Sequence, residues 1–449
     1  MAISQNSAYI FSSRAIQLFI ATLSTIIVPK ILEPDAYGVF MTLILANVIL
    51  GNLSHVSIPT SNKYFIGKDR SRLAAFHTNS IIAIALVCGV IYLVLVFFQA
   101  PLRHLLLRDI SVRNLIIAVS LLPLTLYYLV FVGIMTGLEE IRKLALFNLF
   151  YLCAPPLTFI IIALLLSPTR DHVLMVNTLI IAWACISCAA VPVMMLVLRR
   201  QGAIWSKPDF SIIRQIFSFG SKAHLGTLAG VAFNRMDFFM IRAMFEGSAT
   251  YGVYQLARSW SEKVFRVSSA MDTSAFRSVA AGETDDIIRL VPKLVRTTLY
   301  VAAAFGMIIV IAGPLLMRFV LTKYLAALVP LLILIAGNVF MCGSRMFAMY
   351  FTAHLGKPQI PSAIAWITLL YNIPLVYFLT RHYGISGTAF GIAGSYFIMF
   401  IIYFTLFRFK VRSIPLKEFF VLKKEDINVF GRTASKLLLS LKNLLKRKT

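Results

Sequence analysis

Ten ionisable side chains lie inside strongly apolar stretches of this sequence, and their charges do not balance. The basic and acidic members are Arg14, Lys222, Arg235, Arg258, Lys263, Arg266 and Arg345 against Asp237, Glu262 and Asp272. Each such group costs about 2.5–3.5 kcal/mol at the centre of a bilayer, so most of them must face water or one another. The excess of cations predicts a water-filled cavity that binds an anion, and phosphate above all, because a guanidinium binds it through two parallel hydrogen bonds.

The apolar stretch 250–275 carries the densest set of these charges. At 100° per residue, a helix places its polar side chains within a sector of about 120°. They are Tyr254, Arg258, Glu262, Arg266 and Asp272. Such a stripe predicts a helix that lines the cavity, with acidic neighbours that orient the cations. An internal ladder of salt bridges that only holds helices together is the alternative, but it leaves more cations than anions.

The elements that carry these charges are predicted to be membrane-spanning helices. The chain has 449 residues, of which 59% are hydrophobic and only 14% are charged. Such a composition excludes a soluble enzyme, a disordered protein and a secreted disulfide scaffold. Twelve apolar segments are long enough to span a bilayer, at 8–29, 37–58, 74–98, 114–136, 145–166, 173–198, 215–241, 250–275, 297–317, 326–353, 361–380 and 384–407.

The distribution of lysine and arginine predicts how these segments are oriented. With both termini in the cytoplasm, the cytoplasmic loops and tail hold 27 of the 43 basic residues, against nine on the opposite side. An excess of this kind marks the cytoplasmic side of a membrane protein. Topology therefore explains most of the net charge of +25, and we expect no nucleic-acid partner.

The C-terminal segment 411–449 differs from the rest of the chain because it is rich in lysine. Apolar residues recur in it near helical spacing, from Phe430 to Leu445, between lysines such as Lys436 and Lys442. This pattern predicts a basic amphipathic helix that binds anionic lipids of the cytoplasmic leaflet. A disordered basic tail is the alternative.

Two short motifs recur at nearly the same offset. Tyr37-Gly38 opens the second segment and Tyr251-Gly252 opens the eighth, while Pro101 and Pro314 close the third and the ninth. The spacing predicts an internal duplication, with a six-helix bundle over 1–205 and another over 206–410. Because six is even, both halves enter the membrane in the same direction, as in parallel repeats. The alternative is that Gly and Pro simply mark helix ends.

Four segments resemble those of Wzx-type polysaccharide (O-antigen) flippases, in the MOP superfamily that also holds MATE drug exporters and lipid II flippases. They are ILEPDAYGVF at 31–40, FGS at 219–221 leading to NRMD at 234–237, GVYQLA at 252–257 and HYGISGTA at 382–389. The resemblance covers about residues 1–410. It implies an all-α membrane protein of two six-helix bundles with a central cavity, in the bacterial inner membrane. Lipid II flippases usually have fourteen spans, whereas we count twelve.

The same resemblance implies a substrate and a mechanism. The substrate would be an undecaprenyl-diphosphate-linked oligosaccharide, moved from the cytoplasmic to the periplasmic leaflet by alternating access, with no cofactor. We expect the diphosphate to be bound by Arg14, Lys222, Arg258, Lys263, Arg266 and Arg345. Asp237, Glu262, Asp272 and Tyr254 would support these cations. Other polysaccharide assembly proteins are possible partners.

Two other functions compete with this hypothesis. A polysaccharide polymerase or ligase would also have about a dozen spans, but it typically needs a large periplasmic loop, and the longest outward loop here is short. A cation-coupled MATE antiporter needs an intramembrane carboxylate, and every acid among residues 1–236 lies in a predicted loop. The seven histidines show no metal-binding spacing, and the five cysteines lie in apolar stretches, so neither a metal nor a disulfide framework is expected.

Overall fold

The structure is a computed structural model that describes residues 2–203, 205–266, 268, 271, 275, 279, 283–411 and 414–423. Every regular element in these ranges is helical, as expected for a chain that crosses a bilayer, where helices satisfy their own backbone hydrogen bonds. Asp272 and all of the predicted tail helix lie outside the described residues.

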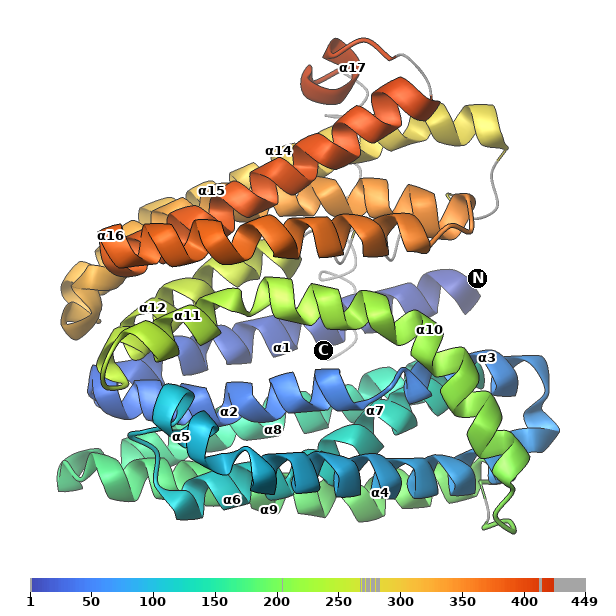
Figure 1. Cartoon of the computed structure of the whole chain (residues 1–449), viewed down its shortest axis with the longest axis horizontal. Coiled ribbons are helices and arrows are strands. Elements are labelled where there is room, and N and C mark those ends of the chain that lie inside the picture. Colours follow the sequence, from blue (N-terminus) through green and yellow to red (C-terminus); the bar gives the residue numbers. More distant parts are fainter. Residues whose placement is uncertain are drawn as a thin grey trace, which may run out of the picture. The chain divides into compact units, whose positions relative to one another are not determined.

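The first half of the chain forms nine α-helices and two short 3₁₀ turns (Figure 1). The helices are α1 (Ala2–Ile31), α2 (Pro34–Ser54), α3 (Ile58–Lys68), α4 (Leu73–Phe97), α5 (Gln99–Leu106), α6 (Val112–Ser120), α7 (Leu122–Gly137), α8 (Ile141–Leu166) and α9 (His172–Arg200). The turns are η1 (Arg70–Arg72) and η2 (Ser167–Thr169). The span predicted at 37–58 corresponds to α2 and the turn after it, and α3 begins at its last residue. The span predicted at 114–136 is divided between α6 and α7.

The second half forms longer helices, with several interruptions. Its elements are α10 (Phe210–Asn234), α11 (Met236–Met244), α12 (Ala249–Ser261), η3 (Glu262–Val264), α14 (Thr284–Phe319), η4 (Thr322–Ala327), α15 (Leu328–Met349), the π-helical η5 (Tyr350–His354), α16 (Gln359–Leu406), the π-helical η6 (Phe407–Val411) and α17 (Lys417–Phe420). Gly384 interrupts α16 with a positive φ of 58°. This kink separates the spans predicted at 361–380 and 384–407.

Helix ends are set by residues suited to those positions. Pro34 begins α2, where a missing N–H costs nothing. Ser111, Asp171 and Asp209 each accept a hydrogen bond from a backbone N–H of the helix that follows, at the starts of α6, α9 and α10. These caps place the polar turns at the ends of the apolar segments.

Nine stretches of described helix are long and apolar enough to cross a membrane. One of them, Gln359–Phe409, contains the last two predicted spans on either side of Gly384. The stretches predicted at 215–241 and 250–275 are not among these nine. The first is interrupted at Arg235, between α10 and α11, and the second runs from α12 into positions that the structure does not describe.

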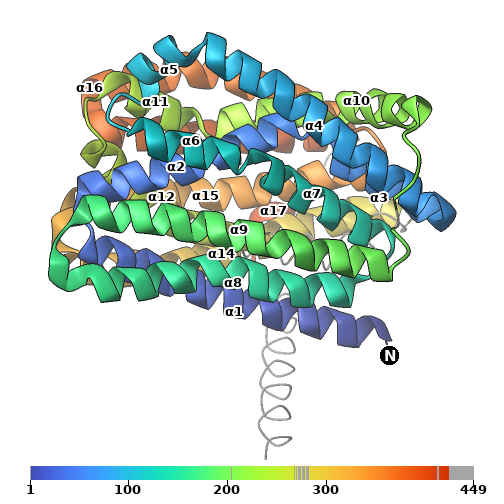
Figure 2. The same ribbon diagram turned by 90° about the horizontal axis from the view of Figure 1, so that it is seen from below.

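The helices pack into two compact units. The first contains Met1–Trp260, Ala312–Leu334 and Ala365–Ile392, and the second contains Ser261–Ile311, Ile335–Ile364 and Ala393–Thr449. In the first unit, α1 lies along α8 and α3 lies along α7 (Figures 1 and 2). Its core is formed by large apolar side chains such as Phe76, Phe131 and Ile216. The predicted six-helix halves, 1–205 and 206–410, stay a prediction.

Candidate functional site

A buried ion pair joins α11 to α12. The Arg258 Nε atom lies 3.3 Å from Oδ2 of Asp237, and the exposed fractions of the two side chains are 1% and 4%. The Tyr254 hydroxyl donates to the same carboxylate oxygen over 3.1 Å. Arg258 also donates from Nη2 to the carbonyl of Asn234, the last residue of α10. The structure therefore brings three of the predicted site residues together, with the charge of Arg258 balanced by Asp237.

Three more predicted site residues follow directly after α12. Glu262 and Lys263 lie in the 3₁₀ turn η3 and are half-buried, while Arg266 is exposed. Lys263 is near enough to be attracted by Glu262 and repelled by Arg266. Because a 3₁₀ turn has three residues per turn, the helical sector calculated from the sequence does not extend past Ser261. Among Glu262, Lys263 and Arg266, the one negative charge of Glu262 stands against two positive charges.

The remaining predicted cations lie on other helices. Arg14 is an exposed residue of α1, and Arg345 is a half-buried residue of α15. Lys222 belongs to α10, but its side chain lies outside the described part of the structure. Arg14, Lys222 and Arg258 belong to the first compact unit, whereas Lys263, Arg266 and Arg345 belong to the second.

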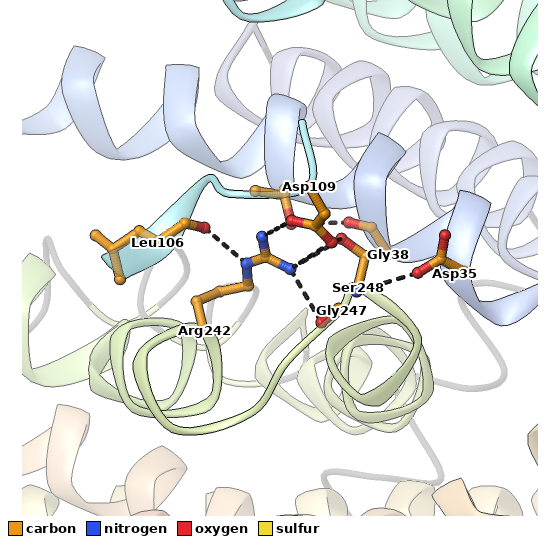
Figure 3. A network of polar contacts seen from close by, with 8 residues as sticks. Asp35, Gly38, Leu106, Asp109, Arg242, Gly247 and Ser248 are labelled. Carbon is orange, nitrogen blue, oxygen red and sulfur yellow. Dashed lines mark hydrogen bonds and ion pairs between the residues drawn. The ribbon is translucent and has the colours of Figure 1, made fainter. Parts of the chain in front are cut away.

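Sequence reasoning missed the densest polar network of the first unit (Figure 3). Arg242 of α11 has a side chain that is only 2% exposed, and its guanidinium forms an ion pair with Asp109 in the loop between α5 and α6. It also donates to the carbonyl of Leu106 over 2.8 Å and to the hydroxyl of Ser248 over 2.8 Å. The Ser248 hydroxyl donates to Asp109, and its backbone N–H donates to Asp35 over 3.1 Å.

The environment of Asp109 favours the ionised carboxylate. Burial by itself raises the pKa of this group, but hydrogen bonds from Arg242 and Ser248, and attraction to the guanidinium, outweigh it. The net effect is a pKa below the ordinary value of 3.8. The network is therefore charged and paired at neutral pH.

The repeated Tyr-Gly motif lies next to this network. A Cβ atom on Gly38 would lie 1.9 Å from the carbonyl oxygen of Ser248, and one on Gly252 would lie 2.1 Å from that of Pro34. Pro34 and Ser248 precede the two glycines by the same four residues, so the contact is reciprocal. The first turns of α2 and α12 thus cross at the closest approach that two backbones allow, which requires glycine.

Further contacts between the two halves of the sequence occur nearby in the same unit. Lys323 forms an ion pair with Glu33 over 2.5 Å, and the Tyr324 hydroxyl donates to the carbonyl of Leu32 over 3.2 Å. A looser pair joins Arg108 to Glu246 over 3.9 Å. The charge count assigns these loops to the side opposite the cytoplasm. The recurrence of Tyr-Gly was the one sequence feature that pointed here.

Among the described residues, no group of three or more His, Cys, Asp or Glu side chains is placed to hold a metal ion. The arrangement offers ion pairs, cations on several helices and buried hydroxyls.

Comparison with known proteins places the chain in a family. A family model described as "Polysaccharide biosynthesis protein" matches residues 3–264. The chain belongs to this family. A search of curated proteins found no match.

Solved structures share the fold at low sequence identity. The inward closed conformation of the lipid II flippase MurJ has a TM-score of 0.69 and 16% identity, over 92% of this chain and 89% of that one. An inward-facing MATE multidrug transporter has a TM-score of 0.65 and 12% identity, over 89% and 98%. A MOP superfamily transporter from Pyrococcus furiosus, described as having a binding pocket of reverse polarity, has a TM-score of 0.61 and 13% identity, over 91% and 95%.

These matches confirm the predicted fold class and family. The chain is an all-α, multi-pass membrane protein of the polysaccharide biosynthesis family, with the fold of MOP superfamily transporters.

Proposed function

We propose that the protein is a Wzx-type flippase. It moves an undecaprenyl-diphosphate-linked oligosaccharide, an O-antigen unit or a similar surface polysaccharide unit, from the cytoplasmic to the periplasmic leaflet of the bacterial inner membrane. Family membership supports the pathway, and the fold supports a transporter rather than an enzyme. The observation that carries the substrate class is the excess of cations over anions within the apolar helices.

We assign recognition of the diphosphate to the predicted cations other than Arg258. Lys263, Arg266 and Arg345 are half-buried or exposed, as is Arg14, and Lys222 completes the set. Arg258 is set apart because it forms a buried ion pair with Asp237 that joins α11 to α12. We therefore give Arg258, Asp237 and Tyr254 the role of holding α11 against α12, and the binding role to the other five cations. Glu262 and Asp272 orient neighbouring cations.

Alternating access gives the Arg242 network a role. Asp109 and Glu33 come from the first half of the sequence, and Arg242 and Lys323 come from the second. With these pairs formed, the path is closed on the periplasmic side, and the pairs separate when it opens there. Moving two negative charges outward is favoured by about 4.6 kcal/mol at a potential of roughly 100 mV, inside negative.

The test is replacement of Lys263, Arg266 and Arg345, singly, with Ala in a strain that lacks its own copy. We expect loss of surface polysaccharide, with the lipid-linked unit held in the cytoplasmic leaflet. Lys357→Ala is the matched control, because this exposed cation lies in the turn before α16. Full surface polysaccharide in all three variants at normal protein level would refute the site. Single units that reach the outer leaflet without polymerising would point to a polymerase instead.

A further inference from the structure

We propose that His55 and His224 form a proton-binding site that controls the bend between α2 and α3, and that Nδ1 of His224 takes the proton. His55 directly follows α2, and His224 lies on α10. Their rings meet edge to face with centroids 5.0 Å apart. His224 is 7% exposed and His55 is half-buried, and the two residues come from the two halves of the sequence.

The hydrogen bonds of each ring define where its proton lies. Nδ1 of His55 accepts from the backbone N–H of Ser57 over 2.8 Å, so the proton of a neutral His55 is on Nε2. Nε2 of His224 lies 2.8 Å from the carbonyl oxygen of Leu53, which can only accept, so this nitrogen carries the proton. Nδ1 of His224 is then a bare acceptor. It is buried, and no described residue donates to it.

The pair is built into a strained bend. Val56 and Ser57 have left-handed φ values of 42° and 51°, which residues with a Cβ rarely adopt. Helix α10 holds this bend in place, because a Cβ on its Gly220 would lie 2.2 Å from the carbonyl oxygen of Val56. The Ser61 hydroxyl also donates to the carbonyl of Ile216 on α10 over 3.1 Å. The hydrogen bonds of the two histidines therefore stabilise a conformation that the backbone alone disfavours.

Adding one proton to the histidine pair changes the stability of this bend. Nδ1 of His224 can take it without losing a hydrogen bond, whereas a proton on Nδ1 of His55 would displace the N–H of Ser57. The resulting imidazolium keeps its hydrogen bond to the Leu53 carbonyl, but it is buried beside a second ring, so its charge is stabilised further only if water reaches the bend. The two rings are too close to be charged together. The site therefore takes one proton, and the protonated form favours a different bend.

Few other charges act on the pair. The Asp, Lys, Arg and His residues on the helices packed against α10 are Asp35 of α2, Lys63 and Lys68 of α3, His77 of α4, and Asp237 and Arg242 of α11. The same helices carry the titratable Tyr37, Tyr64, Cys88 and Tyr92, and Arg72 of η1 donates to Gln215 of α10 over 3.1 Å. Burial and, after it, the neighbouring His224 lower the pKa of His55 to about 4. Lys222 precedes His224 by two residues in the same helix. Its positive charge disfavours a second proton on the histidine pair.

This inference supplies an ion for the transport cycle. A proton bound in one bend of the second span and released in the other would couple a proton gradient to the movement of the halves. That last step rests on the proposed function, whereas proton binding and the change of bend do not.

The experiment uses the full chain in lipid nanodiscs without substrate, so that it stands or fails separately from the flippase proposal. Histidine labelled with ¹⁵N reports protonation by NMR between about pH 8 and about pH 5, a range around the ordinary histidine pKa of ~6.5. Spin labels at Val48 on α2 and Lys68 on α3, in a chain whose five cysteines are replaced, report the bend. We expect one proton to be taken up by the pair, together with a shift of the label-to-label distance.

Two conservative variants separate protonation from packing. His224→Gln keeps an amide N–H for Leu53, and His55→Asn keeps an acceptor for Ser57, but neither side chain titrates in this range. His382→Gln is the control, at an exposed histidine of α16. We expect the acid-induced distance shift to be lost in His224→Gln. It should be kept in His55→Asn, where Nδ1 of His224 can still take the proton, and in the control. A wild-type protein without either change, or a shift that persists in His224→Gln, would overturn the proposal.

Discussion

Arg242 and Asp109 lie 133 residues apart in the sequence and form an ion pair in which the arginine side chain is almost fully enclosed. The guanidinium also donates to the carbonyl of Leu106 at the end of α5 and to the hydroxyl of Ser248 just before α12. One arginine of the second half is thus enclosed by donors and acceptors from both halves. Contacts of this kind hold together segments from the two halves of the sequence. Their free energy opposes the separation of these segments.

Removal of Arg242 should destabilise the protein clearly. Breaking a buried pair typically costs 3–5 kcal/mol, and we expect about 3 kcal/mol for Arg242→Ala because Asp109 keeps 23% exposure. Denaturant unfolding in detergent measures the change. The neighbouring pair Arg108–Glu246 provides the control, because its exposed side chains should make Arg108→Ala cost less than about 1 kcal/mol. Equal effects of the two variants would contradict this account.

The contribution of Asp109 should depend on pH in a defined direction. Its pKa in the folded protein is below 3.8, so its ionised form stabilises the fold fully above the unfolded value. That stability is lost as the pH falls through the folded pKa. We expect the difference in unfolding free energy between wild type and Asp109→Asn to be constant between about pH 8 and pH 5 and to shrink below about pH 4. A difference that grows on acidification would show that the sign is wrong.

The reciprocal glycine contact should not tolerate a methyl group. We expect Gly38→Ala and Gly252→Ala to cost about 1–3 kcal/mol, because each Cβ would meet backbone that cannot move away easily. Gly230→Ala is the matched control, since nothing lies within 4 Å of its Cβ, and helix propensity favours Ala there by about 0.5–1 kcal/mol. The temperature of thermal unfolding and the amount of surface polysaccharide should both fall in Gly38→Ala and Gly252→Ala, but not in Gly230→Ala. Wild-type behaviour of both would exclude a close crossing of α2 and α12.

The Asp237–Arg258 pair can be tested with a mutant cycle. Asp237→Asn leaves the enclosed Arg258 without its carboxylate and should cost about 3–5 kcal/mol. Tyr254→Phe removes one hydrogen bond to that carboxylate and should cost about 1 kcal/mol. The double variant Asp237→Asn with Arg258→Gln should regain part of the loss, because no buried charge is left. Additive losses would mean that the two residues do not depend on each other.

Much of the helical architecture could be predicted from long apolar segments, and the boundary at Gly384 coincides with the kink in α16. The breaks at Val56 and Arg235 could not, because apolar composition is continuous through a bend and does not report backbone angles. Asp237 and Arg258 were recognised as membrane charges, but hydropathy does not say which acid faces which base. Asp109 and Arg242 were missed because each lies in a polar loop or helix end, where a charge needs no partner.

The segment that follows α16 is fastened to α14. Arg296 donates to the carbonyl of Glu418, the Tyr300 hydroxyl donates to that of Phe420 over 2.7 Å, and Phe419 sits among the rings of Phe404 and Phe407. Shortening the chain before Lys417 would therefore remove part of a helix packing arrangement, and not only an appendage.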